Sequence, residues 1–99
     1  MRLNVSDIDR ATILDSVQDM RNNHAEAYAV SGNEAAKELR DFYRALYRKV
    51  SNGESLDNSD IADIVFCLDS SAVNCDELDL DGAASEYRAT IGNVLAVSV

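Results

Sequence analysis

The chain has 99 residues, enough for one domain with a single core, and no internal repeat is visible. Apolar residues make up 46% of it and charged residues 27%, which is typical of a folded globular domain rather than a disordered one. There is no proline and there are only four glycines, whereas sandwiches and barrels with many tight turns usually need more of both. The composition therefore favours helices.

The net charge of −9 is distributed unevenly along the chain. Residues 1–50 carry eight acidic and eight basic residues, whereas residues 51–99 carry ten acidic residues and a single basic one, Arg88. A half with this charge is not expected to bind a nucleic-acid backbone or an anionic membrane directly. It favours a basic protein partner.

The location of the protein is predicted from three further features. Residues 1–7 contain no apolar stretch of the kind found in signal peptides, and no run approaches the roughly eighteen apolar residues of a membrane span. Two cysteines, Cys67 and Cys75, fit free thiols in a reducing compartment better than a disulfide of a secreted protein. We expect a cytoplasmic protein without membrane contact.

Two helices are predicted in the first half of the chain. The first spans about residues 7–30, with Ser6 as its N-cap, Asp9 at the capping-box position and Gly32 as its C-cap. The second spans about residues 34–51 and has a broad apolar face that we expect to be buried. This face consists of Ala35, Ala36, Leu39, Phe42, Tyr43, Leu46, Tyr47 and Val50.

Two more helices are predicted in the second half. The third begins near Asp57, with a hydrophobic staple between Leu56 and Ile61 and with Asp60 at the capping-box position, and its apolar stripe ends at residues 71–73. Residues 74–82 are expected to form an acidic connection. The fourth helix is expected to start near Asp81 and to bury Ala84, Tyr87, Ile91, Val94 and Leu95.

These elements predict an all-α fold, a small bundle of about four helices, with a short extended segment at residues 3–5 as an option. The bundle is expected to be one domain over residues 1–99. Residues 1–50 would form a charge-balanced helical hairpin, and residues 51–99 an acidic helical half.

A calcium site and a catalytic histidine are each only partly supported by the sequence. Glu77, Asp79 and Asp81 have the spacing of the first ligands in an EF-hand-like loop, but Arg88 stands where the closing carboxylate is required. His24 is the only histidine, so a tetrahedral zinc site or a nucleophile–histidine pair has little to build on. We expect His24 to be a packed or interfacial residue, and we predict neither a metal nor another cofactor.

Paired acidic residues raise a further enzymatic alternative. Asp60 and Asp63 are three residues apart, as are Asp76 and Asp79, so each pair would share one side of a helix. The pattern loosely resembles that of the all-helical nucleotide pyrophosphohydrolases, which implies magnesium-dependent hydrolysis of a nucleotide. Those enzymes carry glutamates on facing helices, whereas these are short aspartates and the second pair falls in a predicted loop. We therefore predict a protein without catalytic residues.

A basic and aromatic edge is predicted on the second helix. Arg40, Arg44 and Arg48 are spaced four apart, so neighbours repel each other by a few tenths of a kcal/mol, and Tyr43 and Tyr47 lie beside them. Guanidinium groups next to phenol rings suit three roles. The edge could pack against the acidic half of the same chain, contact a partner or a second copy, or bind the phosphate of a nucleotide.

The acidic half itself has two interpretations. Its charge could serve solubility alone, or its carboxylates could imitate the phosphates of a nucleic acid. The candidate partner-binding residues are Asp57, Asp60, Asp63, Asp69, Asp76, Glu77, Asp79 and Asp81.

We predict a non-catalytic inhibitor or modulator that docks this acidic face on a basic protein that handles nucleic acids. It is similar in size, charge and predicted helix content, though not in any motif, to the anti-restriction and anti-CRISPR proteins of bacterial viruses. That similarity implies action in the cytoplasm of a bacterial host. The alternatives are a homodimeric adaptor and a nucleotide-sequestering protein that uses the basic and aromatic edge.

Overall fold

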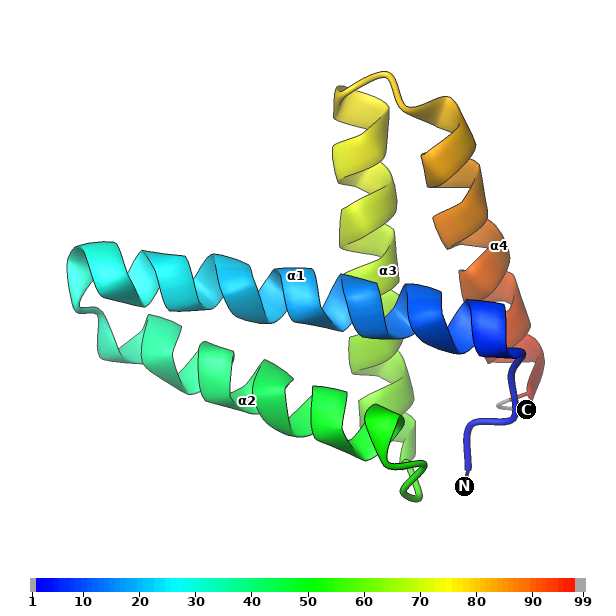
Figure 1. Ribbon diagram of the computed structural model, residues 1–99, viewed down its shortest axis with the longest axis horizontal. Helices are drawn as coiled ribbons and strands as arrows, with labels where there is room; N and C mark the ends of the chain where they lie inside the picture. Colours follow the sequence, from blue (N-terminus) through cyan, green and yellow to red (C-terminus); the bar gives the residue numbers. More distant parts are fainter. Residues whose placement is uncertain (1, 98–99) are drawn as a thin grey trace.

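The computed structural model describes residues 2–97, and these form four helices arranged as two hairpins (Figure 1). The helices are α1 (Asp7–Ser31), α2 (Glu34–Ser51), α3 (Asn58–Glu77) and α4 (Asp81–Val97). The prediction of an all-α bundle is confirmed. Residues 2–6 precede α1 without forming a strand, but Leu3 within them is buried in the core.

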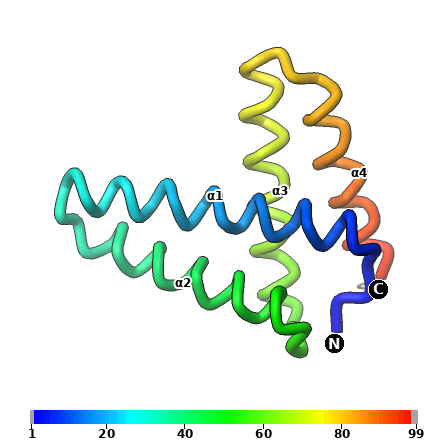
Figure 2. Tube along the Cα trace, in the orientation of Figure 1, coloured from blue at the N-terminus to red at the C-terminus, as the bar shows by residue number. Residues whose placement is uncertain are grey.

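The two hairpins cross each other. Helix α1 packs along α2 and α3 along α4, while α1 also crosses α3 and touches α4 near its own beginning. The α1–α2 turn and the α3–α4 turn therefore stand out in different directions, as the tube in Figure 2 shows. The molecule measures 39 × 35 × 18 Å and is thin in the direction of the crossing. Each hairpin keeps an outer end that the other does not cover.

The ends of α1 are set by local interactions. Ser6 accepts a hydrogen bond from the backbone N–H of Asp9 at 3.1 Å, and Gly32 adopts φ 68° as the C-cap, so both predicted caps are confirmed. The carboxylate of Asp9 does not complete a capping box. It accepts hydrogen bonds from Thr90 at 3.0 Å and Asn93 at 2.9 Å, and so fastens the start of α1 to α4.

The start of α3 is a complete capping box. The Asp57 carboxylate accepts from the N–H of Asp60 at 2.8 Å, and the Asp60 carboxylate accepts from the N–H of Asp57 at 3.1 Å. Asp60 also pairs with Lys49 of α2 at 3.1 Å. Leu56 and Ile61 are both buried, as the predicted staple requires. This junction joins the two hairpins.

The end of α3 lies beyond the predicted one. The expected stop at residues 71–73 is wrong, because the helix continues to Glu77 and the connection to α4 covers only residues 78–80. The polar residues near position 74 suggested a loop. Ala72 and Cys75 are nevertheless buried, and their burial extends the apolar side of α3 by one more turn.

The core lies where the hairpins meet. Its buried apolar side chains are Leu3, Ile13, Val17, Tyr43, Leu46, Val50, Leu56, Ile61, Ile64, Cys67, Leu68 and Val94. Ser16 is also buried at the crossing, where its hydroxyl donates to the Cys67 carbonyl at 2.8 Å and lies 2.6 Å from the Ser71 hydroxyl. Ser16 is small and its hydroxyl is hydrogen-bonded, so it lets α1 and α3 approach closely without leaving a buried polar group unpaired.

Four apolar side chains that we expected to be buried are exposed in large part, and the smallest of them is Ala35. Leu39 is 41% exposed, Phe42 45% and Leu95 48%. The prediction was wrong for Leu39 and Phe42 because α2 packs along α1, and neither α3 nor α4 packs along the remaining apolar positions of α2. In its outer half the α1–α2 hairpin therefore consists of these two helices alone, with no third helix packed against them.

Candidate functional site

The outward side of α3 combines an apolar ridge with flanking acidic residues. Phe66 is 57% exposed and Val73 45% exposed, and a spacing of seven residues places them on one side of the helix. Asp63 and Asp69 precede and follow Phe66 by three residues, so they lie about 60° to either side of it. We call this set, Asp63, Phe66, Asp69 and Val73, the α3 face.

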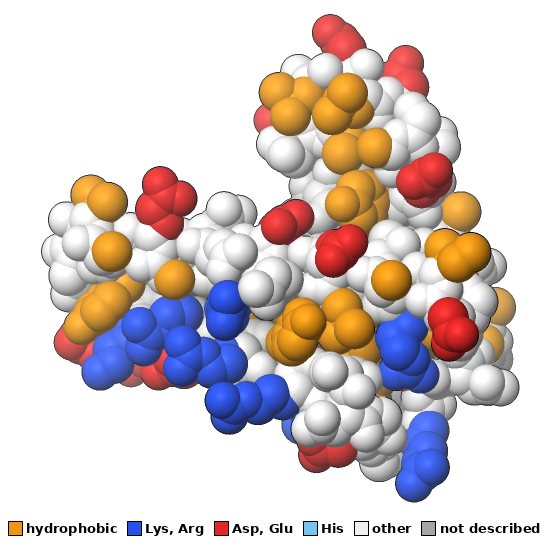
Figure 3. Space-filling model, in the orientation of Figure 1, with side chains coloured by type: hydrophobic (Ala, Val, Ile, Leu, Met, Phe, Trp, Pro, Cys, Tyr) orange, Lys and Arg blue, Asp and Glu red, His pale blue; other side chains and the backbone are white. Residues whose placement is uncertain are grey.

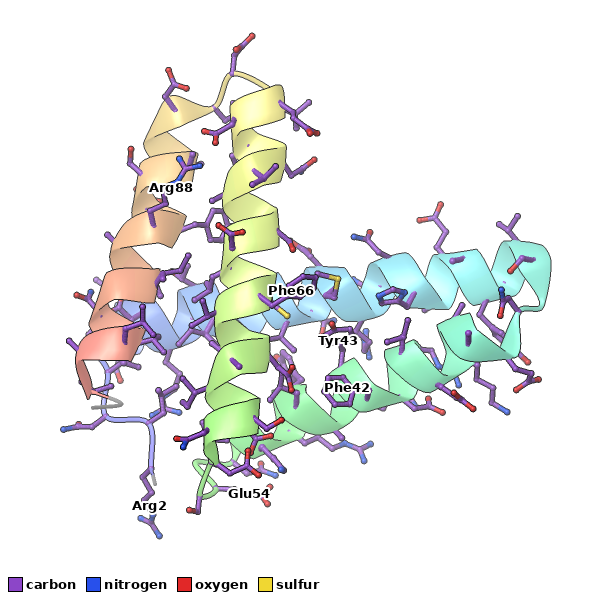
Figure 4. All side chains as sticks on the ribbon, turned by 180° about the vertical axis from the view of Figure 1, so that it is seen from behind. Arg2, Phe42, Tyr43, Glu54, Phe66 and Arg88 are labelled. Carbon is purple, nitrogen blue, oxygen red and sulfur yellow. The ribbon has the colours of Figure 1, made fainter. Side chains whose placement is uncertain are left out.

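An aromatic cluster on α1 and α2 continues this surface. Figure 4 shows Phe42, Tyr43 and Phe66 on one side of the molecule, at the corner where the hairpins meet. The rings of Phe42 and Tyr43 meet edge to face with centroids 5.1 Å apart, and Tyr43 stacks on His24 at 5.6 Å. Tyr43 is buried, whereas Phe42 is 45% exposed and adds to the apolar area beside the α3 face. His24 thus has a packing role.

Asp63 carries its charge in an unfavourable position. Burial raises the pKa of its carboxyl, and the neighbouring charges of Asp60 and Asp57 raise it further. Within residues 2–97, no Lys or Arg forms an ion pair with Asp63. The α3 face therefore presents a carboxylate that a cation from outside would stabilise.

The predicted acidic residues lie in three places rather than along one stripe. Asp57 and Asp60 serve the capping box. Asp63 and Asp69 flank the ridge of α3. Asp76, Glu77, Asp79 and Asp81 lie at the outer end of the α3–α4 hairpin.

The outer acidic group contains one local ion pair. Asp76 forms a bidentate pair with Arg88, which lowers the pKa of the Asp76 carboxyl. Arg88, the only basic residue of the second half, is thereby engaged, and it also lies near Asp69. Glu77, Asp79 and Asp81 remain exposed around the turn.

The predicted basic edge of α2 separates into three environments. Arg40 pairs with Asp41 at 2.9 Å and lies 5.4 Å from the centre of the Tyr28 ring. Tyr43 belongs to the core. The remaining residues line a groove between α1 and α2 with a volume of about 410 Å³, formed by Gln18, Arg21, Arg44, Tyr47 and Arg48.

Sequence reasoning missed Arg21 because it comes from the other helix of the hairpin. Its distance from Arg44 along the chain hides their proximity, and only the antiparallel packing of α1 on α2 brings them together. Arg44 and Arg48 form no ion pair with any acidic residue in the described part of the chain. Figure 3 shows Lys and Arg side chains gathered over α2. We call the groove lined by Gln18, Arg21, Arg44, Tyr47 and Arg48 the basic groove.

A second, polar cleft lies between α1, α3 and α4 and was not predicted. Its volume is about 320 Å³, and it is lined by Ser16, Asp19, Met20, Asn23, Ser70, Ser71, Asn74, Cys75 and Tyr87. Burial raises the pKa of Asp19, and the charge of Asp15 adds to this effect. The lining comes from three helices, so no local sequence pattern could have revealed it.

The groups considered for catalysis or metal binding are placed as follows. Cys67 and Cys75 are free and buried, and burial raises the pKa of the Cys67 thiol to about 12, so it is not a thiolate near neutral pH. Across residues 2–97, no three His, Cys, Asp or Glu side chains gather in a group that could hold a metal ion. No helix in the same range has the length and apolar character needed to cross a membrane.

The fold and its surfaces define a small all-α protein with an acidic, aromatic face on α3 and a basic groove between α1 and α2. No protein-family model, no curated protein and no solved structure matches this chain.

Proposed function

We propose that this protein is a non-catalytic binding protein that docks its α3 face on a basic protein that handles nucleic acids, and thereby inhibits or modulates it. The observation that carries the proposal is the half-exposed Phe66–Val73 ridge with Asp63 and Asp69 on its two sides. An apolar centre bordered by charged groups has the anatomy of a protein interface. Phe42 is a further exposed aromatic side chain on the same side of the molecule as Phe66.

Solubility alone explains this surface poorly. Charges that serve only solubility need no large apolar side chain among them, and an exposed ridge of Phe66 and Val73 works against solubility. The carboxylate of Asp63 is moreover partly desolvated and lacks a cation in residues 2–97. A partner that covers the ridge and supplies a Lys or Arg to Asp63 would offset both the exposure of the ridge and the desolvation of the carboxylate.

The nature of the partner follows from charge and ring chemistry. A net charge of −9 attracts basic proteins and speeds their association at low salt. A groove that binds single-stranded nucleic acid combines basic residues for the phosphates with aromatic residues for the bases. Asp63 and Asp69 would occupy the phosphate positions, and Phe66 and Phe42 would contact the aromatic residues.

A narrower form of the proposal names a restriction or CRISPR nuclease in a bacterial cytoplasm as the partner. It rests on the similarity in size, charge and helix content to virus-encoded inhibitors. Both forms of the proposal require a basic nucleic-acid-binding site on the partner. The following experiment tests for that site.

The test is affinity capture from a bacterial lysate with tagged protein at low and high salt, followed by mass spectrometry. We expect one stoichiometric partner that is basic, is released by salt and loses its nucleic acid when the protein is added. The variants Phe66→Ser and Asp63→Asn/Asp69→Asn should weaken capture strongly. Val30→Ser is the matched control, because Val30 is 85% exposed at the other end of the α1–α2 hairpin.

Asp57 and Asp60 are unsuitable for this test. Both close the capping box, so replacing Asp57 with Ala should cost about 1 kcal/mol of stability whether or not it touches a partner. Equal capture by wild type and by both α3-face variants would contradict the proposal. Capture of a partner that keeps its nucleic acid bound would also contradict the proposal.

A further inference from the structure

We propose that the basic groove binds the phosphate of a nucleoside phosphate. The groove lies between α1 and α2, and its lining has no residue in common with the α3 face. The proposal is therefore independent of the docking function above. Three guanidinium groups, from Arg21, Arg44 and Arg48, converge there from two helices.

Arg21 contributes the guanidinium group from α1. Its Nε is buried and has no hydrogen-bond partner among the described residues, while its Nη2 donates to Asn22 at 3.0 Å. Buried donors are nearly always paired, because an unpaired one forfeits its hydrogen bond to water. The Arg21 side chain lines the groove, so an anion seated there would provide the acceptor that the protein itself does not, once a small rotation of the guanidinium group uncovers Nε.

Arg44 and Arg48 contribute the two guanidinium groups from α2. They lie one helical turn apart and repel each other, and neither has an acidic partner in residues 2–97. Arg40 on the same helix is different, because Asp41 pairs with it at 2.9 Å. A chain with twice as many acidic as basic residues thus leaves two adjacent arginines uncompensated at one place.

The size of the groove and its remaining lining add to the three guanidinium groups. Guanidinium groups bind phosphate oxygens through paired, planar hydrogen bonds. Tyr47 offers an aromatic ring beside them and Gln18 an amide, which suit a base and a sugar. The volume of about 410 Å³ falls within the usual size of small-molecule sites. This combination favours a nucleoside phosphate over inorganic phosphate.

The experiment measures binding of ADP, with inorganic phosphate and sodium chloride at matched ionic strength as comparisons. Thermal unfolding and titration calorimetry are recorded for wild type, for Arg44→Gln/Arg48→Gln and for the control Lys37→Gln/Arg40→Gln. Both double variants lose two positive charges from α2, but only the first removes groups from the groove. Each variant is compared with its own ligand-free form, so differences in stability cancel.

We expect ADP to raise the unfolding temperature of wild type and of the control more than inorganic phosphate does. The groove variant should bind ADP at least about tenfold more weakly, since it loses charge-assisted hydrogen bonds. It should also fold at least as stably as wild type, because a repulsive pair is removed. No stabilisation by ADP, or equal binding by both double variants, would overturn the proposal. Equal effects of ADP and inorganic phosphate would overturn its nucleoside part.

Discussion

At the scale of single residues, Asp63 and Asp76 are opposites. Burial raises the pKa of Asp63, so its proton is held more tightly in the folded than in the unfolded chain, and ionisation at neutral pH costs stability. Arg88 lowers the pKa of Asp76, so ionisation of this carboxyl stabilises the folded state. At neutral pH the charge of Asp63 therefore lowers the stability of the fold, whereas the charge of Asp76 raises it.

The two residues are expected to respond oppositely to substitution. Asp63→Asn should raise the free energy of unfolding at pH 7, and the difference from wild type should shrink as the pH falls to the range of an ordinary aspartate and below. Asp76→Asn should lower the free energy of unfolding at pH 7. This difference from wild type should disappear as the pH falls through the lowered pKa of Asp76. Urea unfolding at pH 7 and at a series of lower pH values down to pH 2 measures both.

The outcome for Asp63 bears on function as well. A substitution that stabilises the free protein but weakens capture of the partner marks a side chain that is kept for binding. Destabilisation by Asp63→Asn at pH 7 would show that the carboxylate has a structural contact instead, and would remove this support for the α3 face.

At the scale of helices, the α1–α2 hairpin is buried at one end only. The buried residues of these helices are Ile13, Ser16 and Val17 in α1 and Tyr43, Leu46 and Val50 in α2. All of them lie in the part that meets the second hairpin. The outer part is held by partly exposed contacts, such as that of Arg40 with the Tyr28 ring.

This asymmetry predicts a gradient of local stability. Backbone amides of residues 22–31 and 34–41 should exchange with solvent faster than those of residues 11–18 and 43–50, because opening the outer end exposes little apolar surface. Hydrogen exchange followed by NMR or mass spectrometry provides the measurement. Uniform protection along α1 and α2 would contradict it. Added ADP should slow exchange around the basic groove if that site is occupied.

The same elements show what could be predicted from the sequence. Helix ends that depend on neighbours in the chain, such as the caps at Ser6, Gly32 and Asp57, were predicted correctly. The end of α3 was not, because it depends on the burial of Cys75. The exposure of Phe42 was missed for a similar reason, since an apolar pattern does not reveal whether a helix lies opposite.

The candidate sites were predicted less completely than the helices. Asp63 and Asp69 of the α3 face were named as acidic positions, but Phe66 and Val73 were not recognised as the exposed apolar side chains beside them. The basic groove needed Arg21, which joins Arg44 only through the packing of α1 on α2. Contacts such as that of Asp9 with Thr90 likewise connect distant parts of the chain and leave no periodic signal.

At the scale of the whole molecule, charge and shape both bear on self-association. A net charge of −9 makes identical copies repel each other, which favours a monomer over the homodimer alternative. The Cα radius of gyration is 13.6 Å. Small-angle scattering at low salt should give a value close to this, together with a monomer mass. A larger particle that dissociates at high salt would instead support pairing between copies.

The crossing of two local hairpins has a consequence for how the chain folds. Helix α1 finds α2, and α3 finds α4, across turns of only a few residues, so most of the packing closes short loops. Chains with such local contacts fold within microseconds to milliseconds. Neither hairpin can bury its apolar side alone, however, and the hydrogen bond from Ser16 to Cys67 joins the two hairpins across 51 positions of the chain. The rate-limiting event is therefore expected to be the meeting of two preformed halves.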